Sequence, residues 1–489
     1  MNSRFIVLQA FVAVSAFGLF GCSRSDETAK PGPAADSPQA TQNVVLITLD
    51  STRADRLSTY GYDRPTSPRL DALAADGVKF EFAIAQSGLT PVSLASILTG
   101  MNPYEHGLRV MHGRVGYQLP SECVTLAEQL KTAGCATGAF VGAFSASQRF
   151  SLEQGFDTFT TGFDAEQAAS EAVSAAGRVE VGSFQCHADE VTRAASEWIE
   201  KQPGRFFVWL HFFDPHDAGL VPPADAATVF EPRSASEDDA RRAAYETEIH
   251  YMDAQIGRLI DTLRQRNLYD ETVIVVVASQ GTGLGEHGWW GGEALWQPQL
   301  HVPLLVRIPG KPAGKAIPDL VRTIDVAATI REAVGLVAEG EGSGLSLMNL
   351  IDGEPDAEPR FAYADLRDIR SDYARAVTKD GAAPDRLYCV MDRDWKLIFH
   401  ELRPAESDVF YLEVDPNEEK NVVVQYPEQS HRLLMVLLAM AGEADKLSLN
   451  LGADDDAMKA LEELGYLSGS KGGSKTAASK PAEIAPSDK

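Results

Sequence analysis

The chain has 489 residues, of which 44% are hydrophobic, so it is long enough to bury one large core or two modest ones. Its formal net charge of −26 argues against nucleic acid as a partner, because binding of phosphate backbones depends on Lys and Arg. The same charge disfavours polyanions in general, unless a local basic pocket overrides the field of the whole chain.

Residues 1–21 are expected to form a secretory signal peptide. Arg4 precedes an uncharged apolar run that ends at Phe20, and Gly21-Cys22 follows, as in a bacterial lipobox. Cleavage before Cys22 would leave a cysteine for acylation, which would anchor the protein in the bacterial cell envelope, on the periplasmic side or at the cell surface. The alternative is a plain signal peptide with an incidental cysteine, because Phe20 is bulkier than usual at its position.

Two terminal segments are predicted to be disordered because they contain few apolar residues. They are the tether at 22–42, which begins with the lipidated cysteine, and the tail at 468–489. Four further cysteines allow three pairings, and the sequence does not choose among them. Pairing of Cys123 with Cys135 and free buried thiols are both consistent with the spacing.

Short, continuously apolar runs alternate with amphipathic ones from 43 to about 336. The apolar runs predict strands at 44–49, 138–141, 206–212, 272–278 and 302–308. The amphipathic runs predict helices at 67–75, 126–133, 188–200 and 240–266. This order predicts an α/β fold for 43–360, with a large, mostly parallel sheet flanked by helices.

After about residue 361 the pattern changes to short strands followed by helices. Strands are predicted at 387–391, 395–400 and 409–412, and helices at 430–441 and 456–464. Residues 361–467 therefore read as a smaller C-terminal α+β subdomain.

In open α/β sheets, ligands bind at the carboxyl ends of the strands. Asp50-Ser51 follows the first predicted strand, Asp214-Pro215-His216 follows the third, and Gln280-Gly281 follows the fourth. His301 directly precedes the fifth. These positions are the first candidates for a functional site.

A series of ordered blocks resembles the sulfatase family, a branch of the alkaline-phosphatase-like metal-dependent hydrolases. The blocks include NVVLITLDSTRADRLSTYGYDRPTSPRLDALAADGVKF, LTPVSLASILTG, FVWLHFFDPH, TVIVVVASQGTGLGEHG, LHVPLLVRIPG and a closing LEELGYL. The resemblance covers about 43–467 and implies the fold and ancestry of that family.

The resemblance implies a divalent metal, usually calcium, held by acidic pairs after the first and fourth strands. Here Asp50 is followed by Ser51, and the later pair is Gln280-Gly281. Only one carboxylate remains at these four positions, so metal binding is expected to be severely weakened. The alternative is a slip in register that lets Glu286-His287 supply a ligand.

At the nucleophile, alignment on Leu98-Thr99-Gly100 places Thr90 where the family has a Cys or Ser that becomes formylglycine, and Leu94 where it has an arginine. Threonine is not a formylglycine precursor, so no formylglycine is expected. Thr90 is then either a metal-activated nucleophile, as in phosphodiesterase relatives, or an N-cap for a helix at 93–98.

In the family, histidines at such places face the bound anion. The expected anion-binding residues are therefore His211, Asp214, His216 and His301. His211 and Asp214 forming a structural pair, and a new zinc site from His211, His216 and Asp50, are the alternatives. Trp289 and Trp290 are expected to pack on the smaller subdomain, with stacking on a sugar ring as the alternative.

The sequence therefore predicts a sulfatase-like lipoprotein whose metal site (Asp50, Gln280) and nucleophile position (Thr90) are degenerate, possessing little or no sulfatase turnover. Its expected ligand is a sulfated or phosphorylated glycan or small ester, and its membrane contact is through Cys22. The alternatives are an active ester hydrolase or transferase that uses Thr90, and a non-catalytic structural lipoprotein of the envelope.

Overall fold

The computed structural model describes residues 41–110, 116–163, 185–216, 222–223, 230–336, 342–367 and 385–442. These residues belong to one compact unit that spans 38–489. The predicted signal peptide, Cys22, the helix at 456–464 and the tail at 468–489 lie outside them. Within the described ranges, no helix combines the length and the apolar character needed to cross a membrane.

An eight-stranded sheet forms the core of the larger part, in the order β10-β2-β9-β6-β1-β5-β3-β4. Its strands are β1 (Asn43–Leu49), β2 (Val78–Ile84), β3 (Ala136–Val141), β4 (Thr158–Thr161), β5 (Phe206–Phe212), β6 (Thr272–Ala278), β9 (His301–Arg307) and β10 (Lys315–Arg322). β1 pairs in parallel with both β5 and β6, whereas β9 runs antiparallel to β2 and β6. The predicted large, mostly parallel sheet is confirmed.

Three strands of this sheet were not predicted, and their burial explains why. In β2, Lys79 and Glu81 interrupt the apolar pattern, and β4 and β10 lie at the two edges with several partly or fully exposed residues. The predicted strands are the ones buried along nearly their whole length. Continuous apolar runs therefore reveal the centre of the sheet but not its edges.

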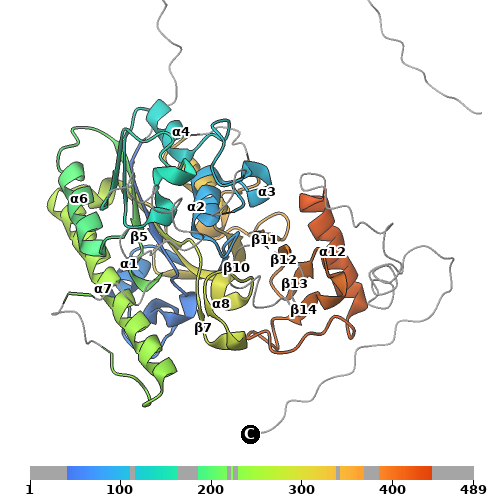
Figure 1. The fold of residues 1–489 in the computed structure, drawn as a ribbon. Helices are drawn as coiled ribbons and strands as arrows, with labels where there is room; N and C mark the ends of the chain where they lie inside the picture. Colours follow the sequence, from blue (N-terminus) through green and yellow to red (C-terminus); the bar gives the residue numbers. More distant parts are fainter. Residues whose placement is uncertain are drawn as a thin grey trace, which may run out of the picture. The chain divides into compact units, whose positions relative to one another are not determined.

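Helices cover both faces of the large sheet (Figure 1). One face carries α1 (Pro68–Ala75), α6 (Ala188–Ile199) and α7 (Glu237–Gln265). The other carries α2 (Thr90–Thr99), α4 (Leu126–Thr132) and α9 (Asp325–Ala333). The short helices are α3 (Pro103–His106), α8 (Gln297–Leu300) and α10 (Met348–Asp352). A two-residue ladder joins β7 (Gly283–Leu284) to β8 (Trp290–Gly291).

A smaller antiparallel sheet follows, in the order β11-β12-β13-β14. Its strands are β11 (Ala362–Leu366), β12 (Leu387–Met391), β13 (Trp395–His400) and β14 (Asp408–Tyr411). Figure 1 shows α12 (Pro427–Ala441) against this sheet, and the two share a hydrophobic cluster of their own. The predicted C-terminal α+β part is thus present, while its exact boundary at 360/361 stays a prediction.

The carboxyl ends of three central parallel strands meet at one edge of the large sheet. Leu49 at the end of β1 is in register with Phe212 of β5 and with Ala278 of β6. The residues that follow these strands are therefore brought together by backbone pairing alone. This edge carries most of the candidate site residues.

Candidate functional site

Asp50 is the centre of a buried polar cluster at this edge, and its side chain is 0% exposed. Its Oδ1 accepts hydrogen bonds from Ser51 Oγ at 2.9 Å and from Gln280 Nε2 at 2.8 Å, and lies 2.9 Å from His216 Nδ1. Its Oδ2 lies 3.3 Å from His211 Nε2. The carboxylate is thus surrounded by side chains of the protein itself.

These surroundings determine the ionisation of Asp50. Burial opposes the charged form and would raise the pKa of Asp50, but the charge of His216 and the contacts with both histidines outweigh it. The pKa therefore lies well below its usual range. Asp50 is ionised at neutral pH, and hydrogen-bonding groups of the protein itself surround its carboxylate.

The two histidines of the cluster differ in exposure and support. His211 is fully buried on β5, and its Nδ1 lies 2.8 Å from Thr48 Oγ1. His216 has a side chain that is 37% exposed and stacks on Phe213, with 4.4 Å between the ring centroids. His216 is therefore the member of the cluster that solvent reaches.

Ser51 occupies a strained position in the turn after β1. Its φ is 49°, in the left-handed region that non-glycine residues seldom adopt. Tyr245 of α7 holds the turn, because its hydroxyl donates to Ser51 O at 2.8 Å and accepts from Arg53 N at 3.0 Å. Ser51 Oγ also lies 2.7 Å from His216 Nδ1, so the serine is tied into the cluster.

Thr90 joins the cluster from the other side, at the first residue of α2. Its hydroxyl accepts a hydrogen bond from Gln280 Nε2 at 2.9 Å, and the residue is 3% exposed. The N-cap interpretation of Thr90 is wrong, because the helix begins at Thr90 itself and its N-cap is Leu89. Leu94, at the family's arginine position, is fully buried in the main hydrophobic core.

The Gln280-Gly281 pair closes the cluster. Gln280 is 1% exposed, and its Oε1 is buried without a hydrogen-bond partner among the described residues. A Cβ atom added to Gly281 would lie 2.1 Å from the backbone oxygen of Pro298 in α8. Position 281 therefore has no room for a ligand side chain, since backbone atoms already fill that space.

These donors fit a hard divalent cation poorly. Such an ion needs several oxygen ligands, preferably carboxylates, and the cluster offers one carboxylate whose Oδ1 already contacts three protein groups. In the described part of the chain, no group of three or more His, Cys, Asp or Glu side chains is placed to hold a metal ion. The orphaned Gln280 Oε1 supplies only a neutral oxygen.

Two predicted anion-binding residues lie apart from the cluster. Asp214 accepts a hydrogen bond from Ala188 N at 3.1 Å and lies 3.7 Å from His187 Nδ1, so it caps α6. His301 Nε2 lies 2.8 Å from Glu81 O, and its ring packs against Phe82. Burial lowers the pKa of His301, which favours its neutral form.

Glu286 and His287, the alternative metal ligands, also point elsewhere. Glu286 Oε1 pairs with Arg53 Nη1 at 2.9 Å, and its Oε2 accepts from Leu284 N at 2.7 Å. His287 stacks on Trp296 with 4.2 Å between the ring centroids. The register slip therefore receives no support from their side-chain contacts.

The arginines near this edge of the sheet were not predicted from the sequence. Arg53 is almost fully buried and pairs with Asp55 at 2.7 Å as well as with Glu286. Trp290 packs against the main hydrophobic core, which includes residues of the smaller subdomain, and the guanidinium groups of Arg241 and Arg242 lie over its ring. The clustering of arginines near a predicted strand end is the sequence signal that could have indicated them.

Comparison with known families places this chain clearly. The family model described as "Sulfatase" matches residues 42–336, which is more than half of the chain. A second model, "N-sulphoglucosamine sulphohydrolase, C-terminal", matches residues 285–439.

Among individual relatives, a choline-sulfatase of Rhizobium meliloti is 28% identical over 43% of this chain, and the match spans only 38% of that relative. An arylsulfatase of Clostridium perfringens is 23% identical over 81% of this chain and 93% of its own length.

Solved structures share the fold. A phosphonate monoester hydrolase of Agrobacterium radiobacter superposes with a TM-score of 0.66 at 22% identity, covering 82% of this chain and 96% of the other. A protein solved with its substrate D-glucosamine-2-N,6-O-disulfate gives a TM-score of 0.64 at 18% identity, covering 85% of this chain and 100% of the other. The chain belongs to the sulfatase family.

Proposed function

We propose that this sulfatase-family protein binds a sulfated or phosphorylated glycan or small ester and has little or no hydrolytic turnover. The observation that carries the proposal is the position of Gln280 Nε2, which donates to Asp50 Oδ1 at 2.8 Å and to Thr90 Oγ1 at 2.9 Å. A neutral amide group therefore bonds both Asp50 Oδ1 and Thr90 Oγ1. A metal held by Asp50 would have to reach Thr90 Oγ1 in order to activate it, and the amide group is already there.

Two further observations support a site that no longer performs ester hydrolysis. Thr90 is 3% exposed, and its hydroxyl accepts a hydrogen bond from the amide nitrogen of Gln280, a group that cannot take up the hydroxyl proton as a general base would. Leu94 places a hydrocarbon where a cationic clamp for an oxyanion would be needed. The ligand class is suggested by relatives such as an N-acetylglucosamine-6-O-sulfatase of Bacteroides thetaiotaomicron.

The decisive experiment measures metal content and turnover on the same protein sample. We expect the purified chain to contain less than one divalent ion per molecule and to hydrolyse nitrophenyl sulfate, nitrophenyl phosphate and a nitrophenyl phosphodiester no faster than the Thr90→Ala variant. Thr99→Ala is the matched control, because Thr99 lies in the same helix and its hydroxyl bonds only Ala95 O, at 2.7 Å, and the neighbouring turn. A stoichiometric metal together with turnover that Thr90→Ala abolishes and Thr99→Ala retains would reject the proposal.

A repair experiment tests the same proposal by gain of function. The geometry rules out Gly281→His as a repair, because the Pro298 backbone oxygen occupies that space. Ser51→Asp with Gln280→Asp would instead place three carboxylates together, and aspartate tolerates the left-handed φ at position 51. Saturating calcium at 100 times its dissociation constant would stabilise this variant by about 2.7 kcal/mol.

Thermal unfolding with and without calcium is the measurement. We expect calcium to raise the melting temperature of the double aspartate variant and to leave the wild type and a Ser51→Asn, Gln280→Asn control unchanged. An equal calcium shift in the wild type would mean that the native cluster already holds the cation, which contradicts the proposed loss.

A further inference from the structure

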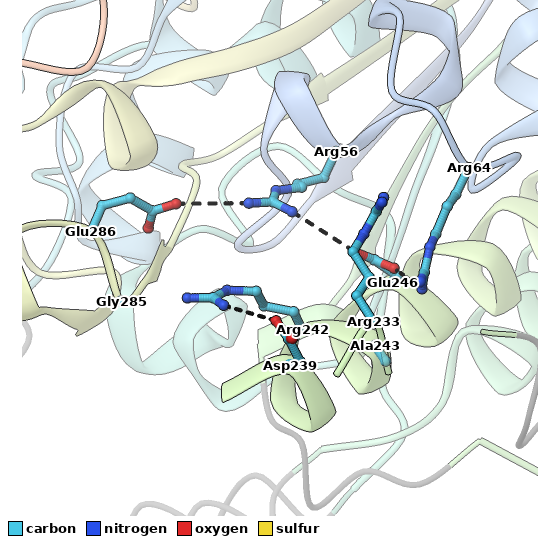
Figure 2. A pocket seen from close by; sticks show the side chains of 9 residues that line it. All are labelled: Arg56, Arg64, Arg233, Asp239, Arg242, Ala243, Glu246, Gly285 and Glu286. Carbon is cyan, nitrogen blue, oxygen red and sulfur yellow. Dashed lines mark hydrogen bonds and ion pairs between the residues drawn. The ribbon is translucent and has the colours of Figure 1, made fainter. Parts of the chain in front are cut away.

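A cavity of about 430 Å³ lies next to the Asp50 turn, and arginine side chains dominate its wall. Figure 2 shows these side chains arranged around a common space, from the segment after β1, from α7 and the residues just before it, and from the loop after β7. The arginines are Arg56, Arg64, Arg233 and Arg242. A volume of this size suits a small organic ligand rather than a single water or ion.

Aromatic rings hold the guanidinium groups in place. Each arginine of the wall stacks over a ring at a distance between 5.4 and 5.7 Å: Arg56 and Arg233 over Tyr62, Arg64 over Phe230, and Arg242 over Trp290. Stacking fixes the plane of a guanidinium while leaving its N–H edge available for an oxyanion. The wall is therefore ordered before any ligand arrives.

Arg56 lies among three carboxylates but makes no direct hydrogen bond to any of them, and its Nη1 donates to the Tyr62 hydroxyl at 3.3 Å. Its guanidinium lies 3.8 Å from Glu246, 3.7 Å from Glu286 and 3.8 Å from Asp55, all beyond hydrogen-bonding distance. Its Nε is buried and has no hydrogen-bond partner among the described residues. A partly buried guanidinium whose Nε has no acceptor favours an additional one, because an unmade hydrogen bond of a charged group is costly.

Carboxylates in and beside the wall neutralise most of its positive charge. Glu246 is engaged by Arg64 Nη1 at 2.7 Å and by the Tyr62 hydroxyl, and Asp239 is engaged by Arg242 Nη1 at 3.1 Å. Four guanidinium groups and three carboxylates, Asp239, Glu246 and Glu286, thus line the cavity, and Arg233 also pairs with Asp63 beside it, at 2.5 Å. The wall is therefore close to neutral, whereas the chain as a whole carries a formal net charge of −26.

We propose that this cavity binds the sulfate or phosphate group of an ester, with Arg56 as its principal contact. The inference rests on the proposed function, in that the same anionic glycan or small ester would supply the group. The anion would then bind beside the buried Asp50 cluster and not within it. Bidentate hydrogen bonds from a guanidinium to two oxyanion oxygens would provide the specificity.

Calorimetric titration of the full chain with inorganic sulfate, inorganic phosphate, glucosamine 6-sulfate and unsulfated glucosamine tests this proposal. We expect Arg56→Gln to weaken binding of the three anions by about tenfold, the loss expected for one charge-assisted pair. Arg193→Gln is the matched control, because Arg193 is 65% exposed on α6 and pairs only with Glu197, at 3.0 Å. Glucosamine without sulfate is expected to bind none of the variants.

A second variant protects the test against misfolding. Asp239→Asn removes a negative charge from the wall and leaves Arg242 held by Leu284 O, so we expect it to strengthen anion binding several-fold, which a damaged fold would not do. Equal affinities in the wild type, Arg56→Gln and Asp239→Asn would overturn the cavity as the site. If those proteins bind the sulfated sugar equally, the proposed function survives without the cavity. If inorganic anions bind in an Arg56-dependent way and the sugar does not bind, the cavity stands and the proposed function fails.

Discussion

His106 is a histidine whose ring is satisfied entirely inside the protein. It is 0% exposed, its Nε2 lies 3.0 Å from Ser96 Oγ, and its Nδ1 accepts a hydrogen bond from Leu108 N at 3.1 Å. Burial and the nearby charge of Arg109 lower the pKa of His106 to about 3. The residue is therefore neutral in the folded protein over a wide pH range.

This burial predicts a pH dependence of stability. In the unfolded chain the histidine has a pKa near 6.5 and takes up a proton below that pH. In the folded protein His106 stays unprotonated down to about pH 3. Stability must therefore fall as the pH falls through that window. We expect His106→Gln to reduce the loss of unfolding free energy between pH 7 and pH 5 by about 2 kcal/mol. Urea unfolding at the two pH values measures it, and equal losses in both proteins would contradict the assignment.

The site itself was partly predictable at the level of single residues. Asp50, His211 and Gln280 could be placed together, because they lie on or directly after adjacent parallel strands. The direction of a hydrogen bond could not be predicted, since it depends on side chains from other elements. Asp214 follows β5 as expected, but its carboxylate accepts a hydrogen bond from the first residue of α6. The residues next to Asp214 in the sequence do not indicate this contact.

Among the elements, predictability followed burial. β5 and β6 were predicted residue for residue, because each is buried along its entire length and flanked by polar turns. β10 was missed because it lies at the edge of the sheet, where Lys315, Ala316, Pro318 and Asp319 are exposed. An edge strand has a neighbouring strand on one side only, and more of its residues face solvent. Its sequence therefore lacks the continuous apolar run that marks a central strand.

A buried ion pair connects β13 of the small sheet to α8 through the segment that follows β14. Lys396 Nζ lies 2.5 Å from Glu418 Oε1, and both side chains are 0% exposed. Glu418 Oε2 also accepts from Gln297 N, the first residue of α8, at 2.6 Å. One carboxylate therefore links β13 to the helix whose Pro298 closes on Gly281.

Removing one partner of this pair should be far more damaging than removing both charges. We expect Lys396→Met to lower the unfolding free energy by about 3 to 5 kcal/mol, because it leaves the Glu418 charge buried and uncompensated. The double variant Lys396→Met, Glu418→Gln should recover part of that loss. A double-mutant cycle by urea unfolding measures the coupling, and strictly additive losses would show that the pair is not coupled.

At the scale of the whole molecule, we propose that acyl chains on Cys22 hold the protein at a membrane. The proposal rests on the Gly21-Cys22 pair that follows the apolar run ending at Phe20, because acyl chains on a cysteine anchor a protein by burying CH₂ groups. We expect Cys22→Ser to move the protein from the membrane fraction to the soluble fraction of cells that express it, without changing its melting temperature. Immunoblots of separated fractions measure this, and continued membrane retention of the variant would reject lipid anchoring.

The close approach of the Pro298 carbonyl to Gly281 has a consequence for how this protein can evolve. A descendant that acquired an acid at position 280 could not acquire a large ligand at 281 by a second point substitution, since α8 would first have to withdraw. That helix is in turn held by Glu418 from a distant part of the chain. A pair of ligand side chains at 280 and 281 would require several coordinated changes with no benefit until the last, so single substitutions alone do not lead to it.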